Sequence, residues 1–191
     1  MERKFESKMK RFILIITLFL ISCNSNDDNS FVSLKYSFEK WYFKNHPVQS
    51  SLKNIRVYDD YFLSNDYKTN ERYILDMKRF YFELTQIDYL NLSKINKIKY
   101  DRIKKILNKA IYLIEKVRVQ ESKPSLMLNK IKFGLIYLVN YNPSLKSIQS
   151  RLSQVESLLN NSLINITHLS DPELRKTYNI INEILMILEN I

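Results

Sequence analysis

Glycine is almost absent from this chain, and its scarcity restricts the possible folds more than any other feature. The 191 residues include one glycine, Gly134, and four prolines. Phosphate-binding loops and dinucleotide-binding folds need several closely spaced glycines, which allow tight turns and close backbone approach to the ligand. An all-β fold needs a turn signal about every 8 to 12 residues. The composition therefore excludes these nucleotide-binding folds and argues against an all-β fold.

Apolar residues recur at intervals of three and four, the spacing that places them on one face of a helix. Pro47, Pro124 and Pro143 interrupt the pattern, and Ser93 is placed to cap a helix. The pattern predicts an all-α, irregular bundle of about six helices, with a long irregular connection over 48–66. The first helix should begin near Phe31 and end near Pro47, and the others should cover 69–87, 94–120, 125–140, 145–166 and 171–188.

The last helix carries two predictions of its own. Ser170 and Glu173 have the spacing of a capping box, in which each side chain bonds the backbone amide of the other residue. One apolar stripe follows, and it is expected to face the core. Its members are Leu174, Tyr178, Ile181, Leu185 and Leu188.

A basic flank and an uncharged, mostly apolar run lie near the N-terminus. The run covers the ten residues 12–21, which as a helix would span about 15 Å, half of a bilayer core. This length is typical of a secretory signal peptide. Leu20-Ile21-Ser22-Cys23 resembles the lipobox of bacterial lipoproteins, which implies cleavage before Cys23 and acylation of its sulfur, with palmitate among the expected acyl groups. The alternatives are an ordinary signal peptide with an incidental cysteine, or a buried apolar helix.

These features predict three regions: a lipoprotein signal peptide over 1–22, a flexible tether over 23–30, and an all-helical domain over 31–191. Met9 is the expected start, since Glu2 and Glu6 dilute the positive charge that precedes the apolar run. The lipid at Cys23 would anchor the protein in the cell envelope. Asn24, by resemblance to lipoprotein sorting signals, favours the outer membrane where the cell has one.

The charge of the expected mature chain does not indicate nucleic-acid binding. Removal of 1–22, with five basic and two acidic side chains, leaves 169 residues and reduces the formal net charge from +10 to +7. The remaining basic residues are mixed with acidic ones, and no run of five or six like charges occurs. The expected partner is the membrane, through acylated Cys23, with a peptide, glycan or protein as a second candidate partner, and no nucleic acid is expected.

Residues that could carry catalysis are few. His46 and His168 are the only histidines, and they do not form the His-Glu-x-x-His spacing of a zinc site. Structural or solvent-exposed roles are expected for both. Asp59 and Asp60 could form a carboxylate pair, but adjacent acids in a polar loop are more often solvated. We therefore predict no catalytic residue, no metal ligand and no cofactor, with Cys23 as the one modified site.

Several short motifs are similar to the N-terminal part of the domain of unknown function 885 family. This bacterial family has many lipoprotein members and resembles zinc metallopeptidases of the gluzincin type. In full-length members the zinc motif lies far downstream of the region that these residues match, so the resemblance assigns no catalytic role here. The motifs are Phe38-x-x-Trp41-x-x-x-x-His46-Pro47, Tyr58-Asp59-Asp60, Leu84-x-x-Ile87-Asp88 and Leu92-Ser93.

Two hypotheses about function remain open. The chain could be the lipid-anchored helical portion of a metallopeptidase-like protein, lacking the zinc site and inactive alone. Alternatively, it could be an independent lipoprotein of the cell envelope that binds a partner between its helices. An exposed apolar patch of several hundred Å² would favour the second hypothesis.

Overall fold

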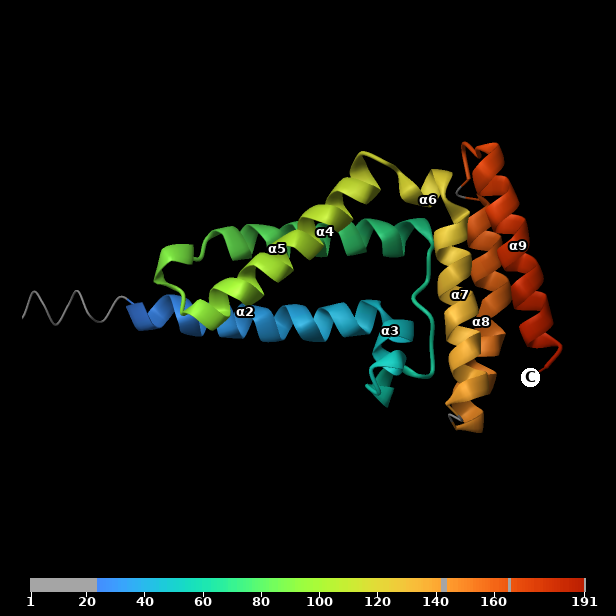
Figure 1. The fold of residues 1–191 in the computed structure, drawn as a ribbon, viewed down its shortest axis with the longest axis horizontal. Coiled ribbons are helices and arrows are strands. Elements are labelled where there is room, and N and C mark those ends of the chain that lie inside the picture. Colours follow the sequence, from blue (N-terminus) through green and yellow to red (C-terminus); the bar gives the residue numbers. More distant parts are fainter. Residues whose placement is uncertain (1–23, 142–143, 165, 191) are drawn as a thin grey trace, which may run out of the picture.

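The computed structural model describes residues 24–141, 144–164 and 166–190, and these residues form an all-α fold (Figure 1). Six helices have 17 to 22 residues each, which confirms the predicted irregular helical bundle. No described helix is both long and apolar enough to cross a bilayer. The helices are α2 (Asn24–Asn45), α3 (Pro47–Leu52), α4 (Tyr67–Thr85), α5 (Lys94–Glu115), α6 (Val119–Ser122), α7 (Pro124–Asn140), α8 (Leu145–Ile164) and α9 (Asp171–Leu188).

Helices α2, α4 and α5 form one group around an aromatic core. Phe38 of α2 meets Phe80 of α4 edge to face, with 5.5 Å between ring centroids. This geometry suits the quadrupoles of two aromatic rings. The predicted aromatic stripe of the first helix packs in this core. The buried members of the core are Phe31, Phe38, Met77, Phe80, Leu84, Leu92, Tyr100, Ile103 and Leu107.

Helices α7, α8 and α9 form a second group, whose helices run across the direction of the first (Figure 1). The apolar stripes predicted for 125–140 and 145–166 both pack in its core. Gly134 of α7 allows the Phe62 ring to approach the helix, because a Cβ atom at this position would lie only 2.2 Å from Phe62 Cε1. The single glycine therefore serves packing between α7 and the connection that follows α3.

The connection over 48–66 is partly helical, with α3 and a 3₁₀ turn at Arg56–Tyr58. Asp59, which we expected to be solvated, is buried, and its carboxylate accepts hydrogen bonds from Ser51 and Tyr137. The Ser51 hydroxyl in turn accepts a 2.7 Å bond from the fully buried Arg151 of α8. The hydrogen bonds to its carboxylate offset the cost of burying Asp59, whereas Arg151 Nε and Nη1 are buried without a hydrogen-bond partner among the described residues. Val57, expected to pack on the bundle, is 75% exposed.

The expected flexible tether is wrong for residues 24–30, which belong to α2. Polar side chains in this segment bond the connection between α4 and α5. Asp28 Oδ1 accepts from the Ser93 backbone amide at 2.9 Å and from Asn96 Nδ2 at 3.1 Å. Asp27 Oδ2 accepts from Asn91 Nδ2 at 2.9 Å. Ser93 does precede α5, but its side chain makes no capping bond.

The predicted capping box of α9 does not form. Ser170 precedes α9 without a side-chain capping bond, and Glu173 Oε1 instead accepts a 3.1 Å bond from the Ser125 amide. This amide belongs to the first turn of α7, where backbone N–H groups have no partner within the helix. A carboxylate is favoured there by the helix dipole as well. Glu173 therefore connects α9 to the start of α7.

The core-facing side of α9 was predicted correctly only for Ile181, which packs against the core. Thr177, Ile180 and Ile184 are buried, whereas Leu174, Tyr178 and Leu185 are exposed. The sequence of this helix contains two adjacent apolar stripes, and periodicity alone cannot choose between them. Ile180 and Ile184 pack in the core that α7 shares, and this leaves the predicted stripe at the outer edge of the molecule.

Candidate ligand-binding cavity

Cys23, the predicted lipidation site, lies outside the described residues. The structure separates the two histidines: His168 is exposed before α9, whereas His46 is half-buried between α2 and α3. Within the described residues, no three His, Cys, Asp or Glu side chains are grouped so that they could hold a metal ion.

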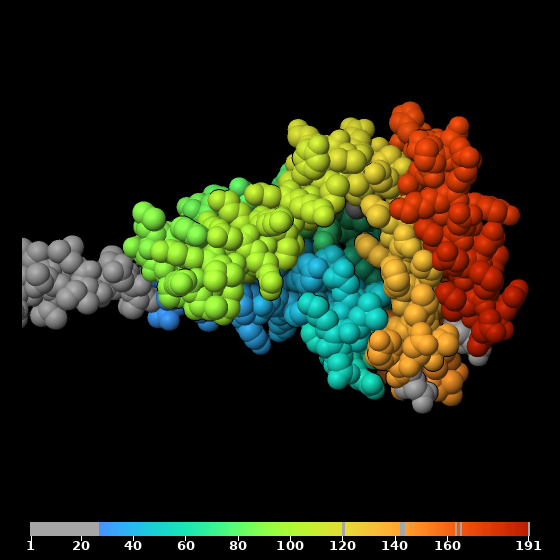
Figure 2. Space-filling view, viewed as in Figure 1, coloured from blue at the N-terminus to red at the C-terminus, as the bar shows by residue number. Residues whose placement is uncertain are grey.

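Two adjoining cavities lie between the helix groups, and Figure 2 shows the molecule hollowed where α2, α5 and α7 meet. Their volumes are about 300 and 290 Å³. Four residues line both cavities, so the two spaces adjoin around the same side chains. The shared residues are His46, Leu63, Met127 and Lys130.

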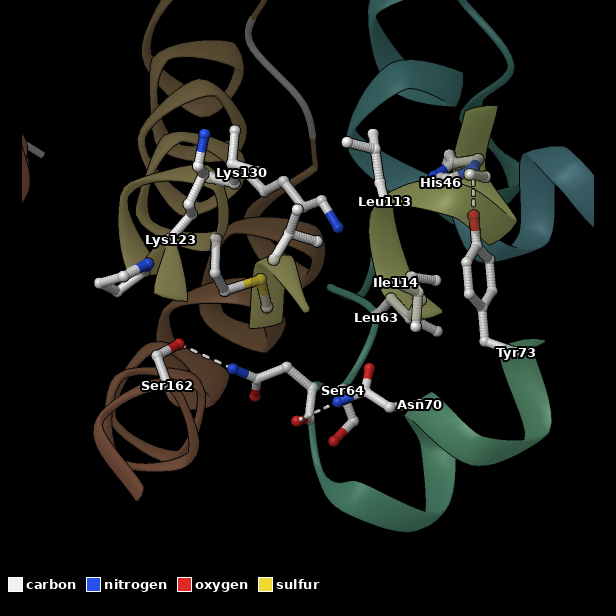
Figure 3. Close-up of a pocket in the computed structure, with 16 residues that line it drawn as sticks. His46, Leu63, Ser64, Asn70, Tyr73, Leu113, Ile114, Lys123, Lys130 and Ser162 are labelled. Atoms are coloured by element: carbon white, nitrogen blue, oxygen red, sulfur yellow. Dashed lines mark hydrogen bonds between the residues drawn. The ribbon is translucent and has the colours of Figure 1, made fainter. Parts of the chain in front are cut away.

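The walls of the first cavity are apolar on the α5 side and polar at the base. Leu113 and Ile114 of α5 supply aliphatic surface. At the base, Asn65 Nδ2 donates to Ser162 Oγ at 2.7 Å, and Asn70 Nδ2 donates to the Asn65 carbonyl at 2.8 Å (Figure 3). The second cavity continues between Val48, Phe62 and Phe133. An apolar cavity with a few polar groups is the usual form of a small-molecule site, although each volume is at the small end of the range.

Lys130 extends from α7 into the space between the helix groups (Figure 3). Its ammonium makes no hydrogen bond or ion pair with a described residue. Neither cavity has an aspartate or a glutamate among its described lining residues. Burial lowers the pKa of Lys130, because an apolar environment disfavours the charged amine. Lys130 also keeps exposed surface, so a ligand could reach the ammonium.

His46 is held at the other side of the cavity by the break between α2 and α3. Pro47 disfavours helical geometry at the preceding residue, and His46 has φ −131° and ψ 60°. Its Nε2 lies 3.1 Å from the Tyr73 hydroxyl, in a hydrogen bond whose direction depends on the imidazole tautomer. Stacking on Trp41, with ring centroids 5.2 Å apart, helps to position Tyr73.

The same surroundings keep His46 neutral. Its pKa is lowered to about 3, first by burial and second by the positive charge of Lys130. Burial, together with the neighbouring Tyr42, raises the pKa of Tyr73. Near pH 7 His46 and Tyr73 therefore form a neutral hydrogen-bonded pair. Lys130 and Lys123 are the two cations that line the first cavity, both keep exposed surface, and of the two only Lys130 also lines the second cavity.

The sequence analysis did not identify Lys130. A signal was present: between residues 124 and 140 the only charged side chains are Lys130 and Lys132. Lys132 Nζ pairs with Glu183 Oε2 of α9 at 2.7 Å, and Lys130 is left without an acid. Which lysine lacks a partner depends on the packing of α9 against α7, and periodicity does not give that information.

Comparison of the chain with models of protein families, with curated proteins and with solved structures finds no match. The resemblance to the domain of unknown function 885 family stays a prediction from short sequence motifs.

Proposed function

We propose that this chain is a lipid-anchored protein of the bacterial cell envelope whose helical body binds a small apolar molecule carrying one carboxylate. The anchor rests on the lipobox-like residues that end at Cys23. The binding role rests on one structural observation: the Lys130 ammonium lines both mostly apolar cavities and has no hydrogen-bond or ion-pair partner among the described residues. This proposal favours the second hypothesis from the sequence, with a small ligand in place of a peptide or protein.

Charge explains why the ligand should be an anion. An ammonium group in apolar surroundings is costly to maintain unless an opposite charge pairs with it. A bound carboxylate would supply that charge and would accept charge-assisted hydrogen bonds from Lys130. Because His46 is neutral and no described lining residue is acidic, the only charges along the described walls are the positive charges of Lys130 and, in the first cavity, Lys123, which favours a ligand with a carboxylate.

Shape explains why the rest of the ligand should be apolar. Leucine, isoleucine, valine and phenylalanine side chains surround the space around Lys130 in both cavities. Burial of aliphatic ligand surface against them is favourable by about 25 cal/mol per Å². A fatty acid of medium length combines the required head and tail.

Titration calorimetry with dodecanoate and dodecanol tests the binding role on purified residues 24–191. A hydrogen bond to a charged group contributes about 1.5–3 kcal/mol, so dodecanoate should bind roughly 10- to 100-fold more tightly than the alcohol. Lys130→Met should abolish this preference. Lys109→Met removes an exposed lysine of α5 that lies outside both cavities, and it should preserve the preference. Equal affinity for the two compounds in the unmutated protein would contradict the binding role.

Labelling of cells with radioactive palmitate tests the anchor separately. The wild-type chain should incorporate label and fractionate with membranes, because a thioether-linked diacylglycerol and further acylation hold a protein stably at a bilayer. Cys23→Ser should incorporate no label. An intact N-terminus and an unmodified Cys23 thiol, measured by mass spectrometry of the wild-type protein, would refute the anchor without affecting the binding role.

A further inference from the structure

The outer face of α9 carries an apolar stripe that no described part of the chain covers. Four of its members are 36 to 64% exposed, and Ile181 between them is half-buried. Figure 2 shows α9 at the end of the molecule opposite to α2. We call this surface the α9 seam, and it consists of Leu174, Tyr178, Ile181, Leu185 and Leu188.

The spacing of the α9 seam is that of a helix that packs against another helix. Its successive members are separated by four, three, four and three residues, which is the a/d pattern of a coiled coil. The buried residues of both cores are other residues of the helices, including Ile180 and Ile184 on the neighbouring face of α9, and of the seam only Ile181 also packs against a core. The seam is thus a second apolar face on a helix that is already packed against α7.

We propose that the α9 seam pairs with the α9 seam of a second copy of this chain, in antiparallel orientation. The seam is nearly symmetric about Ile181, so a two-fold axis at this residue brings Leu174 beside Leu188 of the second copy. The same axis brings Tyr178 beside Leu185. A two-fold interface uses the same surface on both subunits, as this arrangement does.

Charge on the flank of the seam favours the antiparallel orientation. Arg175 and Glu189 are exposed, follow the seam residues Leu174 and Leu188, and lie on the same side of the seam. In the antiparallel pair Arg175 lies beside Glu189 of the second copy, and the contact occurs twice. In a parallel pair this flank would face Thr177 and Ile184 of the second copy, which are buried against its own core. Opposite charges beside a helix seam are the usual determinants of partner orientation.

Cysteine cross-linking of the full chain in its membranes tests the pair. Ile181→Cys places two thiols across the proposed axis, within the Cα separation of about 4.4 to 6.8 Å that a disulfide needs, and mild oxidation should give a covalent dimer. Asn179→Cys, on a neighbouring exposed position outside the seam, is the matched control and should remain monomeric, as should the chain that carries only Cys23. A yield from Ile181→Cys no greater than that from Asn179→Cys would overturn the proposal.

Two further sets of variants test the orientation. Leu174→Cys combined with Leu188→Cys should cross-link, whereas Leu174→Cys alone should not, because its counterpart is distant in the antiparallel pair. In the Ile181→Cys background, Arg175→Glu should reduce the dimer yield several-fold, and addition of Glu189→Arg should restore it. Lys176→Glu, an exposed change away from the seam, should have no effect. Efficient cross-linking of Leu174→Cys alone, or failure of the second charge change to restore the yield, would refute the antiparallel arrangement.

Discussion

Burial lowers the pKa of both His46 and Lys130, and the positive charge of Lys130 lowers that of His46 further. The consequence for His46 is a neutral imidazole that can share a proton with Tyr73. The consequence for Lys130 is an ammonium whose charge a bound anion would stabilise. At the scale of single residues, the candidate site is therefore a neutral hydrogen-bonded pair and the Lys130 ammonium around a mostly apolar space, with Lys123 at the edge of the first cavity.

The lowered pKa of His46 predicts a loss of stability in mild acid. In the unfolded chain the imidazole takes up a proton near pH 6.5, whereas in the folded protein it does so near pH 3. The unfolded state thus binds more protons between these values, and the free energy of unfolding falls as the pH falls from 6.5 toward 3. From pH 7 to pH 5 the loss attributable to His46 should be about 1–2 kcal/mol, since each unit of pKa shift corresponds to roughly 1.4 kcal/mol.

Urea denaturation at pH 7 and pH 5 measures this loss. His46→Gln has no group that titrates in this range, and it should lose less stability than the wild type over the interval. His168→Gln is the matched control, because it changes the exposed histidine and should leave the pH dependence as it is in the wild type. An unchanged pH dependence in His46→Gln would show that His46 is not kept neutral by its surroundings.

At the scale of helices, sequence predicted most elements but not all of their contacts. Helix α7 was predicted almost to the residue because Pro124 begins it and one clear stripe defines its core face. The residue range of α9 was predicted correctly, but most of its buried face was not, because the helix carries two adjacent apolar stripes. Glu173 shows the same limit. Its carboxylate accepts from the backbone amide of the distant Ser125, not from the amide of Ser170 that the capping box predicted.

The candidate site was beyond sequence analysis for a related physical reason. Its residues come from every described α-helix except α9 and from the connection after α3, so the cavities exist only once the two helix groups meet. His46 was recognised as a noteworthy residue from composition alone. Lys130 was not recognised, because only the folded structure shows that no described aspartate or glutamate lines the cavities beside its ammonium.

At the scale of the whole molecule, α2 separates the predicted anchor from the cavity. Its 22 residues span about 33 Å, and His46 follows its C-terminal end. One acyl chain occupies about half of a bilayer core of roughly 30 Å, so a lipid at Cys23 is too short to reach Lys130. A ligand of the proposed site would then be a separate molecule. Helix α9 lies at the end of the molecule opposite to the start of α2 (Figure 1).

The pKa of a bound carboxyl group tests the central claim most directly. Dodecanoate labelled with ¹³C at its carboxyl carbon can be titrated by NMR while it is bound to the protein. If the carboxylate lies beside the Lys130 ammonium, its pKa should fall below the ordinary value of about 4.3 for a carboxyl group, and it should stay ionised down to pH 4. In Lys130→Met the same carboxyl should protonate above pH 5, because apolar surroundings then act alone. A bound carboxyl that protonates above pH 5 in the wild type as well would contradict the account.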